Sequence, residues 1–188
     1  MKQLLVSIAL FLPLVTLAQE EAAPQAGSGL SYSYVELRFV DADNDGDGLR
    51  FGASYELNDE WFLLGEITSL DYSGSVDRFT LELGAGYVYE LEQEFDVFAT
   101  FTLIDTEIDT PFGDADDSGF GVSAGARGSL APEFEVRGSV NHVNLDDSDT
   151  FLELAGDYYF NDQLSAGASL EFAGDEDLFT LGARYHFR

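Results

Sequence analysis

The chain contains no cysteine, so disulfide bonds and thiolate chemistry are both excluded. Basic residues are scarce, with 8 Lys and Arg against 36 Asp and Glu, so the basic surface that nucleic-acid binding requires is missing. Beyond the N-terminus no segment approaches the ~20 apolar residues of a membrane-spanning helix. The 45% of hydrophobic residues, with 19 Gly and 16 Phe, argue against a disordered chain and favour short strands joined by turns.

The N-terminus is organised like a secretory signal peptide. Met1-Lys2 is positive, residues 4–17 are mostly apolar, and Thr16-Leu17-Ala18 places small residues where signal peptidase reads them. The alternative, a membrane anchor helix, needs a longer apolar run. We therefore predict a signal peptide over 1–18, a flexible periplasmic segment over 19–29 and a single barrel domain over 30–188.

Apolar and polar residues alternate from Leu30 onward, which predicts an all-β chain. Two kinds of break interrupt the pattern. The short ones lie at 58–60, 92–94, 131–133 and 161–163. The longer, acidic ones lie at 41–48, 70–77, 105–118, 144–149 and 174–177. Short turns at one end and long loops at the other are typical of outer-membrane barrels.

We therefore expect a single closed antiparallel transmembrane β-barrel of ten strands, with eight strands as the alternative. An even number places both termini on the periplasmic side. The expected strands cover 30–40, 49–57, 61–69, 78–91, 95–104, 119–130, 134–143, 150–160, 164–173 and 178–188.

The two faces of each expected strand differ in a way that a membrane barrel demands. Its outer face must be apolar, its lumen accepts polar groups, and strand side chains alternate between the two. In the strand over 78–91, Phe79 and Leu83 share one face, whereas Arg78 and Glu82 share the other. All the arginines fall on the polar face, and an Arg facing lipid at mid-depth would cost ~2–4 kcal/mol. The predicted lumen charge network comprises Glu36, Arg38, Arg50, Glu66, Arg78, Glu82, Arg127, Arg137, Glu153, Asp157, Glu171 and Arg184.

Opposite charges confined in so narrow a lumen should pair, because an unpaired buried charge is strongly destabilising. We expect a largely closed interior, with a thin water-filled channel as the alternative. A soluble lipocalin-like barrel would also separate its faces, but aromatic residues gather here beside the short turns, as in a membrane-interface girdle. The predicted girdle comprises Tyr55, Trp61, Tyr87, Tyr89, Phe95, Phe134, Tyr158, Phe160, Tyr185 and Phe187.

Three segments carry a resemblance to known barrels. The C-terminal strand, apolar at alternate positions from Phe179 to Phe187, resembles the signal that the barrel-assembly machinery of Gram-negative bacteria recognises, although Arg188 follows the last Phe. The opening LSYSYVE over 30–36 and LAPEFEVRGSV over 130–140 resemble the small outer-membrane barrel family known from xanthomonads. The general architecture is similar to that of OmpA-like and OmpX-like barrels. The resemblance implies an outer-membrane location and the assembly machinery as a partner, and it carries over no catalytic residues.

One segment has the spacing of a metal site. Residues 41–48 match the first half of an EF-hand loop, with Asp41, Asp43, Asp45 and Asp47 as Ca²⁺ candidates and Gly46 allowing the turn. The twelfth position is Gly52 instead of Glu, so a solvated tight loop is the alternative. The other acidic loops could hold divalent cations that bridge to lipopolysaccharide phosphates. Apart from this possible Ca²⁺, we expect no cofactor.

An enzyme is not expected, because catalysis needs a base and a nucleophile in reach. The chain has 2 His, and His142 lies near Asp146 and Asp147 with no Ser at a recognisable spacing. The sequence therefore favours a barrel with a structural, surface-interaction or adhesion role, in contact with outer-membrane lipid and lipopolysaccharide. The alternatives are a narrow porin-like channel for small cationic solutes and, more distantly, a lipid A-modifying enzyme.

Overall fold

A computed structural model of the chain describes residues 30–43, 45–92, 94–174 and 176–187. The predicted signal peptide over 1–18 and the predicted flexible segment over 19–29 lie outside these residues, as does Arg188. Within the described part of the chain, no helix is both long and apolar enough to cross a membrane.

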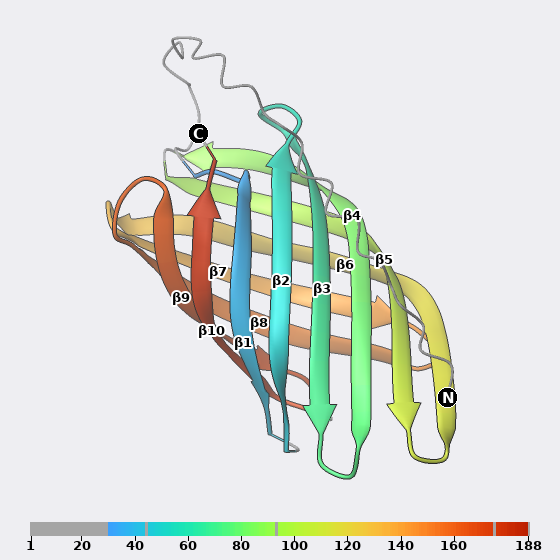
Figure 1. The fold of residues 1–188 in the computed structure, drawn as a ribbon. Helices are drawn as coiled ribbons and strands as arrows, with labels where there is room; N and C mark the ends of the chain where they lie inside the picture. Colours follow the sequence, from blue (N-terminus) through green and yellow to red (C-terminus); the bar gives the residue numbers. More distant parts are fainter. Residues whose placement is uncertain (1–29, 44, 93, 175, 188) are drawn as a thin grey trace, which may run out of the picture.

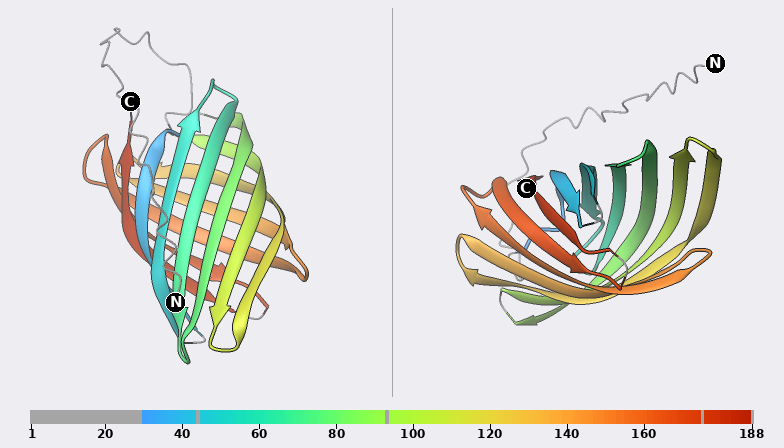
Figure 2. Two further views of the ribbon diagram at one scale, coloured as in Figure 1. Left: turned by 45° about the vertical axis from the view of Figure 1, so that its right-hand side comes forward. Right: turned by 90° about the horizontal axis from the view of Figure 1, so that it is seen from below.

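Ten antiparallel strands form one closed barrel in the order β1-β10-β9-β8-β7-β6-β5-β4-β3-β2 (Figure 1). β1 pairs with both β2 and β10, so the sheet has no free edge. The strands are β1 (Tyr34–Ala42), β2 (Gly46–Glu56), β3 (Trp61–Tyr72), β4 (Val76–Glu92), β5 (Phe95–Thr110), β6 (Gly113–Ala131), β7 (Phe134–Asn144), β8 (Ser148–Tyr159), β9 (Leu164–Phe172) and β10 (Leu178–His186). In Figures 1 and 2 the strands of the far wall cross behind those of the near wall, as the tilted strands of a closed barrel do. The predicted ten-strand barrel is confirmed.

The two ends of the barrel differ in how far the strands extend beyond the membrane-spanning part. β1 starts and β10 ends at one end, where Tyr34 pairs with His186, and we call this the terminal end. At the other, distal end, the β3–β4 and β5–β6 hairpins project furthest (Figure 1). β4, β5 and β6 have 17, 16 and 19 residues, more than the ~9–11 that cross a bilayer. β4 extends past β3 at the terminal end, where Glu90 and Glu92 pair with β5 alone.

The predicted long acidic loops over 41–48, 70–77 and 105–118 are wrong, whereas the predicted break over 174–177 is observed. The expected loop over 105–118 is nearly all strand, because β5 runs on to Thr110 and β6 resumes at Gly113. The longest distal connection covers only residues 173–177. The strands continue beyond the hydrocarbon layer because pairing between them satisfies the backbone N–H and C=O groups. The acidic side chains of these extensions remain in water.

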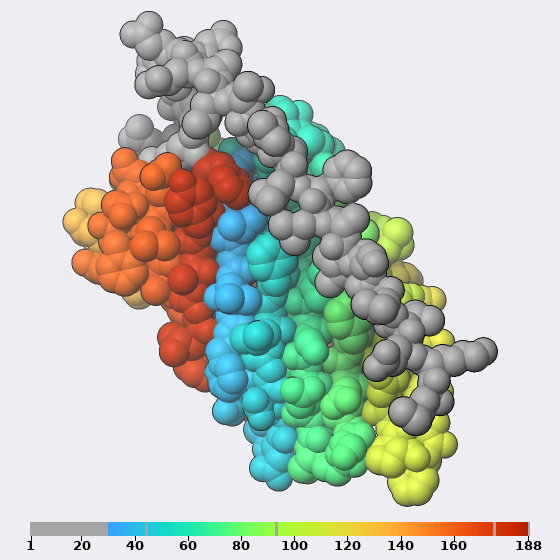
Figure 3. All heavy atoms as spheres, in the orientation of Figure 1, coloured from blue at the N-terminus to red at the C-terminus, as the bar shows by residue number. Residues whose placement is uncertain are grey.

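Apolar and charged side chains are distributed inside out relative to a soluble protein. Leu103 on the outer wall is 64% exposed, whereas Arg184 inside is 2% exposed. The arginines of the described chain are buried or half-buried, and none lies on the outer wall. Where its visible face can be followed in Figure 3, that wall is a continuous layer of side chains over β1 to β4. A lipid bilayer is the solvent that this distribution fits.

The apolar core is a small cluster inside the lumen. It consists of Tyr32, Phe62 and Val88, with Leu64 and Phe98 packed against it. β1 begins at Tyr34, so the predicted strand start at Leu30 is wrong. Residues 30–33 instead enter the terminal end of the barrel, where Tyr32 and Ser33 are buried.

Gly86 lets the Phe62 ring lie flat against β4, because a Cβ atom there would sit 2.1 Å from the Phe62 Cζ atom. We expect Gly86→Ala to displace the ring and to lower the free energy of unfolding by about 1–3 kcal/mol, the usual range for overpacking. Gly156→Ala is the matched control, since its new Cβ would make an ordinary 3.4 Å contact with Phe134. Urea unfolding in lipid vesicles measures both variants. Equal stability of the two would contradict this role of Gly86.

Candidate functional site

The candidate site is the lumen, which contains three layers of ion pairs stacked along the barrel axis. Side chains alternate between the two faces of each strand, and these charged side chains fall on the inner face. The tilt of the strands brings groups that are distant in sequence to the same height along the barrel axis. Each layer joins strands that are not neighbours in the sheet. The lumen is therefore crossed by side chains and not merely lined by them.

The terminal layer is the most buried. Arg127 on β6 forms a two-pronged pair with Glu135 on β7, at 2.6 Å and 2.7 Å, and Tyr159 donates a further hydrogen bond to Glu135 at 2.8 Å. The carboxylate of Glu36 accepts from Arg38 and from Arg184, each at 2.9 Å. Two-pronged guanidinium–carboxylate pairs are among the strongest hydrogen-bonded contacts in proteins.

Long contacts join this layer across the lumen. The Arg38 Nη2 atom of β1 lies 3.3 Å from Asp157 on β8. Arg184 of β10 approaches Asp157 at 3.8 Å and Glu135 at 3.9 Å. Arg38 and Arg184 are thereby each near more than one carboxylate, which compensates the desolvation of their charges.

Tyr32 fills the part of the terminal end that the ion pairs leave. Its ring lies 4.8 Å from the Phe62 ring, and the Arg127 guanidinium lies 4.6 Å from its ring centre. Its backbone N–H donates to the Glu56 carboxylate at 2.6 Å, and Arg127 donates to the Ser31 carbonyl at 2.9 Å. A cation over an aromatic face is attractive, more so when desolvated.

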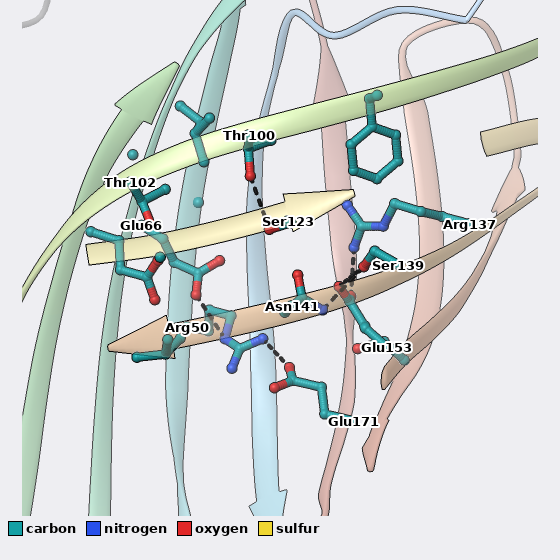
Figure 4. Close-up of a pocket in the computed structure, with 18 of the residues that line it drawn as sticks. Arg50, Glu66, Thr100, Thr102, Ser123, Arg137, Ser139, Asn141, Glu153 and Glu171 are labelled. Carbon is teal, nitrogen blue, oxygen red and sulfur yellow. Dashed lines mark hydrogen bonds and ion pairs between the residues drawn. The ribbon is translucent and has the colours of Figure 1, made fainter. Parts of the chain in front are cut away.

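The middle layer surrounds a cavity of about 190 Å³. Arg50 pairs with Glu66 at 3.1 Å and with Glu171 at 2.5 Å, and Arg137 pairs with Glu153 at 2.7 Å (Figure 4). Five glutamates but only three arginines line this cavity, namely Glu36, Glu66, Glu82, Glu153, Glu171, Arg38, Arg50 and Arg137. The cavity wall therefore carries more carboxyl groups than guanidinium groups.

Glu82 contributes to that excess. It lies directly opposite Glu66 in the β3–β4 ladder. Among the residues that the structure describes, Glu82 takes part in no ion pair. It is the one member of the predicted network that the structure leaves outside such a pair.

The distal layer is smaller. Arg78 pairs with Glu176 at 2.8 Å, and the Tyr72 hydroxyl donates to the same carboxylate at 2.9 Å. Glu176 and Glu135 were absent from the predicted network. Glu135 could have been found from the alternation of its strand, which points its side chain into the lumen. Glu176 lies in a connection between strands, where side chains do not alternate between two faces.

The predicted girdle residues lie on the outer wall at the terminal end. Edge-to-face pairs join Trp61 to Tyr87 at 5.1 Å and Tyr158 to Phe160 at 5.4 Å. Tyr185 and Phe187 pair in the same way at 5.7 Å. The remaining members, all with exposed rings, are Tyr55, Tyr89, Phe95 and Phe134.

The predicted Ca²⁺ ligands are not gathered round one point. Asp41 and Asp47 lie opposite each other in the β1–β2 ladder, and Asp43 and Asp45 lie in the turn. Asp45, and not Gly46, adopts the positive φ of this turn, at 65°. No group of three or more His, Asp or Glu in the described ranges is arranged to hold a metal ion.

Asp41 and Asp47 belong instead to a longer feature that the sequence did not reveal. Six exposed aspartates occupy one hydrogen-bonded row across β1 to β6, each opposite the next. We call Asp41, Asp47, Asp71, Asp77, Asp109 and Asp114 the aspartate row. On β1 and β4 it lies just beyond the apolar outer wall, since Phe39 and Phe79 are two residues away on the same face. On β5 it lies further out, since Asp105 and Glu107 lie between Leu103 and the row.

The two histidines are apart from each other. His142 Nδ1 lies 2.8 Å from the Thr150 hydroxyl, and it bonds neither Asp146 nor Asp147 in the described chain. His186 is buried at the terminal end, with Nε2 3.5 Å from the Ser165 hydroxyl. The acid–base pair considered from the sequence does not form.

Comparison with known proteins places the chain among outer-membrane barrels. A family model described as "Outer membrane protein beta-barrel domain" matches residues 4–187. The KdgM porin is similar with a TM-score of 0.55 at 12% identity, over 82% of this chain and 99% of that one. The NanC porin is similar with a TM-score of 0.54 at 8% identity, over 81% of this chain and 100% of that one. A structure described as a bacterial polysaccharide outer membrane secretin has a TM-score of 0.50 at 15% identity, over 85% and 67%.

At these identities the structural likeness shows the fold alone. No curated protein matches the sequence. The narrower resemblance to the xanthomonad family stays a prediction, as does recognition of the C-terminal strand by the assembly machinery.

The terminal layer generates a stability prediction. Glu135→Gln would leave Arg127 buried with a neutral partner, so we expect a loss of about 3–5 kcal/mol in unfolding free energy, as when one member of a buried pair is removed. Glu133→Gln, on the same hairpin but exposed, is the control. Urea unfolding in vesicles measures the difference. A loss under 1 kcal/mol for Glu135→Gln would show that the layer contributes little.

Proposed function

Because the chain belongs to the outer membrane protein beta-barrel domain family and resides in the bacterial outer membrane, we propose that it acts there as a closed barrel with a structural and surface-interaction role. The carrying observation is the filling of the terminal end, where Tyr32, Arg127, Glu135 and Arg184 meet across the lumen. Ions need a continuous hydrated path, and a layer of paired, buried side chains removes it. We infer that the terminal end faces the periplasm and the distal end faces outward.

A porin-like channel remains the second candidate, favoured by the cavity in the middle layer and by the fold shared with the KdgM and NanC porins. A further KdgM porin structure is described as being in complex with disordered oligogalacturonate, whose uronate groups are anionic. The acidic cavity of this chain is poorly suited to such an anion. We propose no catalytic role, since among the described residues His142 bonds neither Asp146 nor Asp147, and the Ser165–His186 contact is fully buried at the terminal end.

The aspartate row supplies the surface that would interact. Carboxylates directly opposite one another in a ladder repel, and each such pair costs roughly 0.2–1 kcal/mol. Divalent cations relieve that repulsion, and Mg²⁺ is commonly held by one or two carboxylates together with phosphate groups. We propose that the row contacts lipopolysaccharide phosphates through such cations.

The closed-barrel proposal is tested by electrophysiology. In planar lipid bilayers we expect the folded protein to show no steady openings, because the terminal layer and Tyr32 block the lumen. A heat-modifiability gel on the same preparation establishes that the inserted protein is folded. Steady single-channel steps from such a preparation would support the porin-like candidate instead.

The cation proposal is tested by thermal unfolding in vesicles that contain lipopolysaccharide. Mg²⁺ should raise the Tm of the natural protein and of the control Asp59→Asn/Asp162→Asn, whose residues lie in terminal-end turns. It should have little effect on Asp71→Asn/Asp77→Asn, which removes three opposed pairs of the row. In chelator, the row variant should be the more stable protein. An equal response of both variants to Mg²⁺ would remove the row from the proposal.

A further inference from the structure

Tyr32 spans part of the lumen as a single side chain. Its ring is 7% exposed and touches Phe62 on β3, while Arg127 on β6 covers it from the other side. β3 and β6 are separated in the sheet by β4 and β5, so the ring bridges between strands that do not pair. Removal of this ring would leave a gap between the apolar cluster and the terminal layer.

The segment that carries Tyr32 is attached without strand pairing. It precedes β1. The Glu56 carboxylate accepts from the Tyr32 N–H and the Ser33 hydroxyl, and the Glu56 backbone N–H donates to the Ser33 hydroxyl at 3.1 Å. Arg127 donates to the Ser31 carbonyl. Ser33 is also fixed to the backbone, since Phe187 donates to its carbonyl at 2.9 Å. Tyr32 can therefore leave the lumen about Ser33 while every strand ladder stays intact.

The cavity of the lumen begins beyond Leu64 and Phe98, which pack against the cluster that contains Tyr32 and also line the cavity. The cavity of the middle layer is lined by five glutamates against three arginines, and Glu82 lies outside the ion pairs. Hydroxyl and amide groups of Thr102, Ser139 and Asn141 supply further polar lining. Negative rings of this kind favour cations over anions in membrane pores.

We propose that Tyr32 is a displaceable plug, and that its release opens a path for small inorganic cations through the lumen. The proposal rests on the closed state proposed above and adds a second, conducting state to it. Arg127 remains paired with Glu135 when Tyr32 leaves, so the terminal layer persists at one side of the opened path.

The experiment compares three proteins in planar bilayers with KCl: the natural chain, Tyr32→Ala and Tyr32→Phe. Tyr32→Ala removes the ring and should show steady openings. Tyr32→Phe retains the ring that meets Phe62 and Arg127, so it should behave as the natural chain does. Heat-modifiability gels verify that each variant is folded.

The outcomes separate the two proposals. Openings in Tyr32→Ala alone support the plug. Openings in the natural chain that grow in Tyr32→Ala overturn the closed state but keep the plug. Equal behaviour of all three folded proteins, whether closed or open, overturns the plug.

A thiol probe covers the case in which Tyr32→Ala does not refold into bilayers. The chain has no cysteine, so Ser123→Cys places a single thiol in the cavity. In outer membranes of expressing cells, a reagent supplied from the periplasmic side should label Ser123→Cys faster when Tyr32→Ala is also present than when Tyr32→Phe is. Equal labelling rates would overturn the plug.

The proposed selectivity for cations is tested separately, by the reversal potential. In a KCl gradient, the reversal potential of Tyr32→Ala should be shifted toward that of K⁺. Adding Glu82→Gln should reduce this shift, and adding Glu92→Gln, an exposed residue near the turn after β4, should leave it unchanged. A reversal potential near that of Cl⁻ in Tyr32→Ala would overturn cation passage.

Discussion

Every backbone N–H and C=O group of this chain that lies in hydrocarbon must form its hydrogen bond with a neighbouring strand, because no water is available there. Closure of β1 onto β10 meets that requirement and removes the last free edge. Once the sheet is closed, strand alternation leaves only two destinations for a side chain, lipid or lumen. The exposed leucines and phenylalanines of the outer wall and the buried arginines inside are two results of this one constraint.

The free-energy cost of this constraint arises in the lumen, where charged side chains are desolvated. Charges that cannot face lipid are confined in a space that ten strands enclose, and each needs a partner of opposite sign. The terminal layer meets this need with contacts between non-adjacent strands, such as Arg38 to Asp157 and Arg184 to Asp157. The same contacts tie non-adjacent strands together and fill the cross-section, so charge pairing and closure have a common cause.

Beyond the hydrocarbon layer, water can hydrate side chains on both faces of a strand, so the outer face no longer has to be apolar. β4, β5 and β6 continue as paired strands into water, where both faces accept charge. The aspartate row forms there because nothing apolar has to be covered. The mutual repulsion of its carboxylates is tolerable in water and would not be in lipid, so the row lies outside the apolar wall on each strand that carries it.

The sequence by itself determined the features that depend on a two-residue period. Strand number, the separation of charges such as Arg78 from rings such as Phe79, and the position of the aromatic residues beside the short turns follow from local alternation. Only the tertiary structure decided which arginine meets which carboxylate, that residues 30–33 enter the lumen, that most of the acidic breaks are strand, and that six aspartates share one row. Those features depend on strand register and on closure of the barrel, which bring together residues as far apart as Glu36 and Arg184, and no periodicity along the chain records such distances.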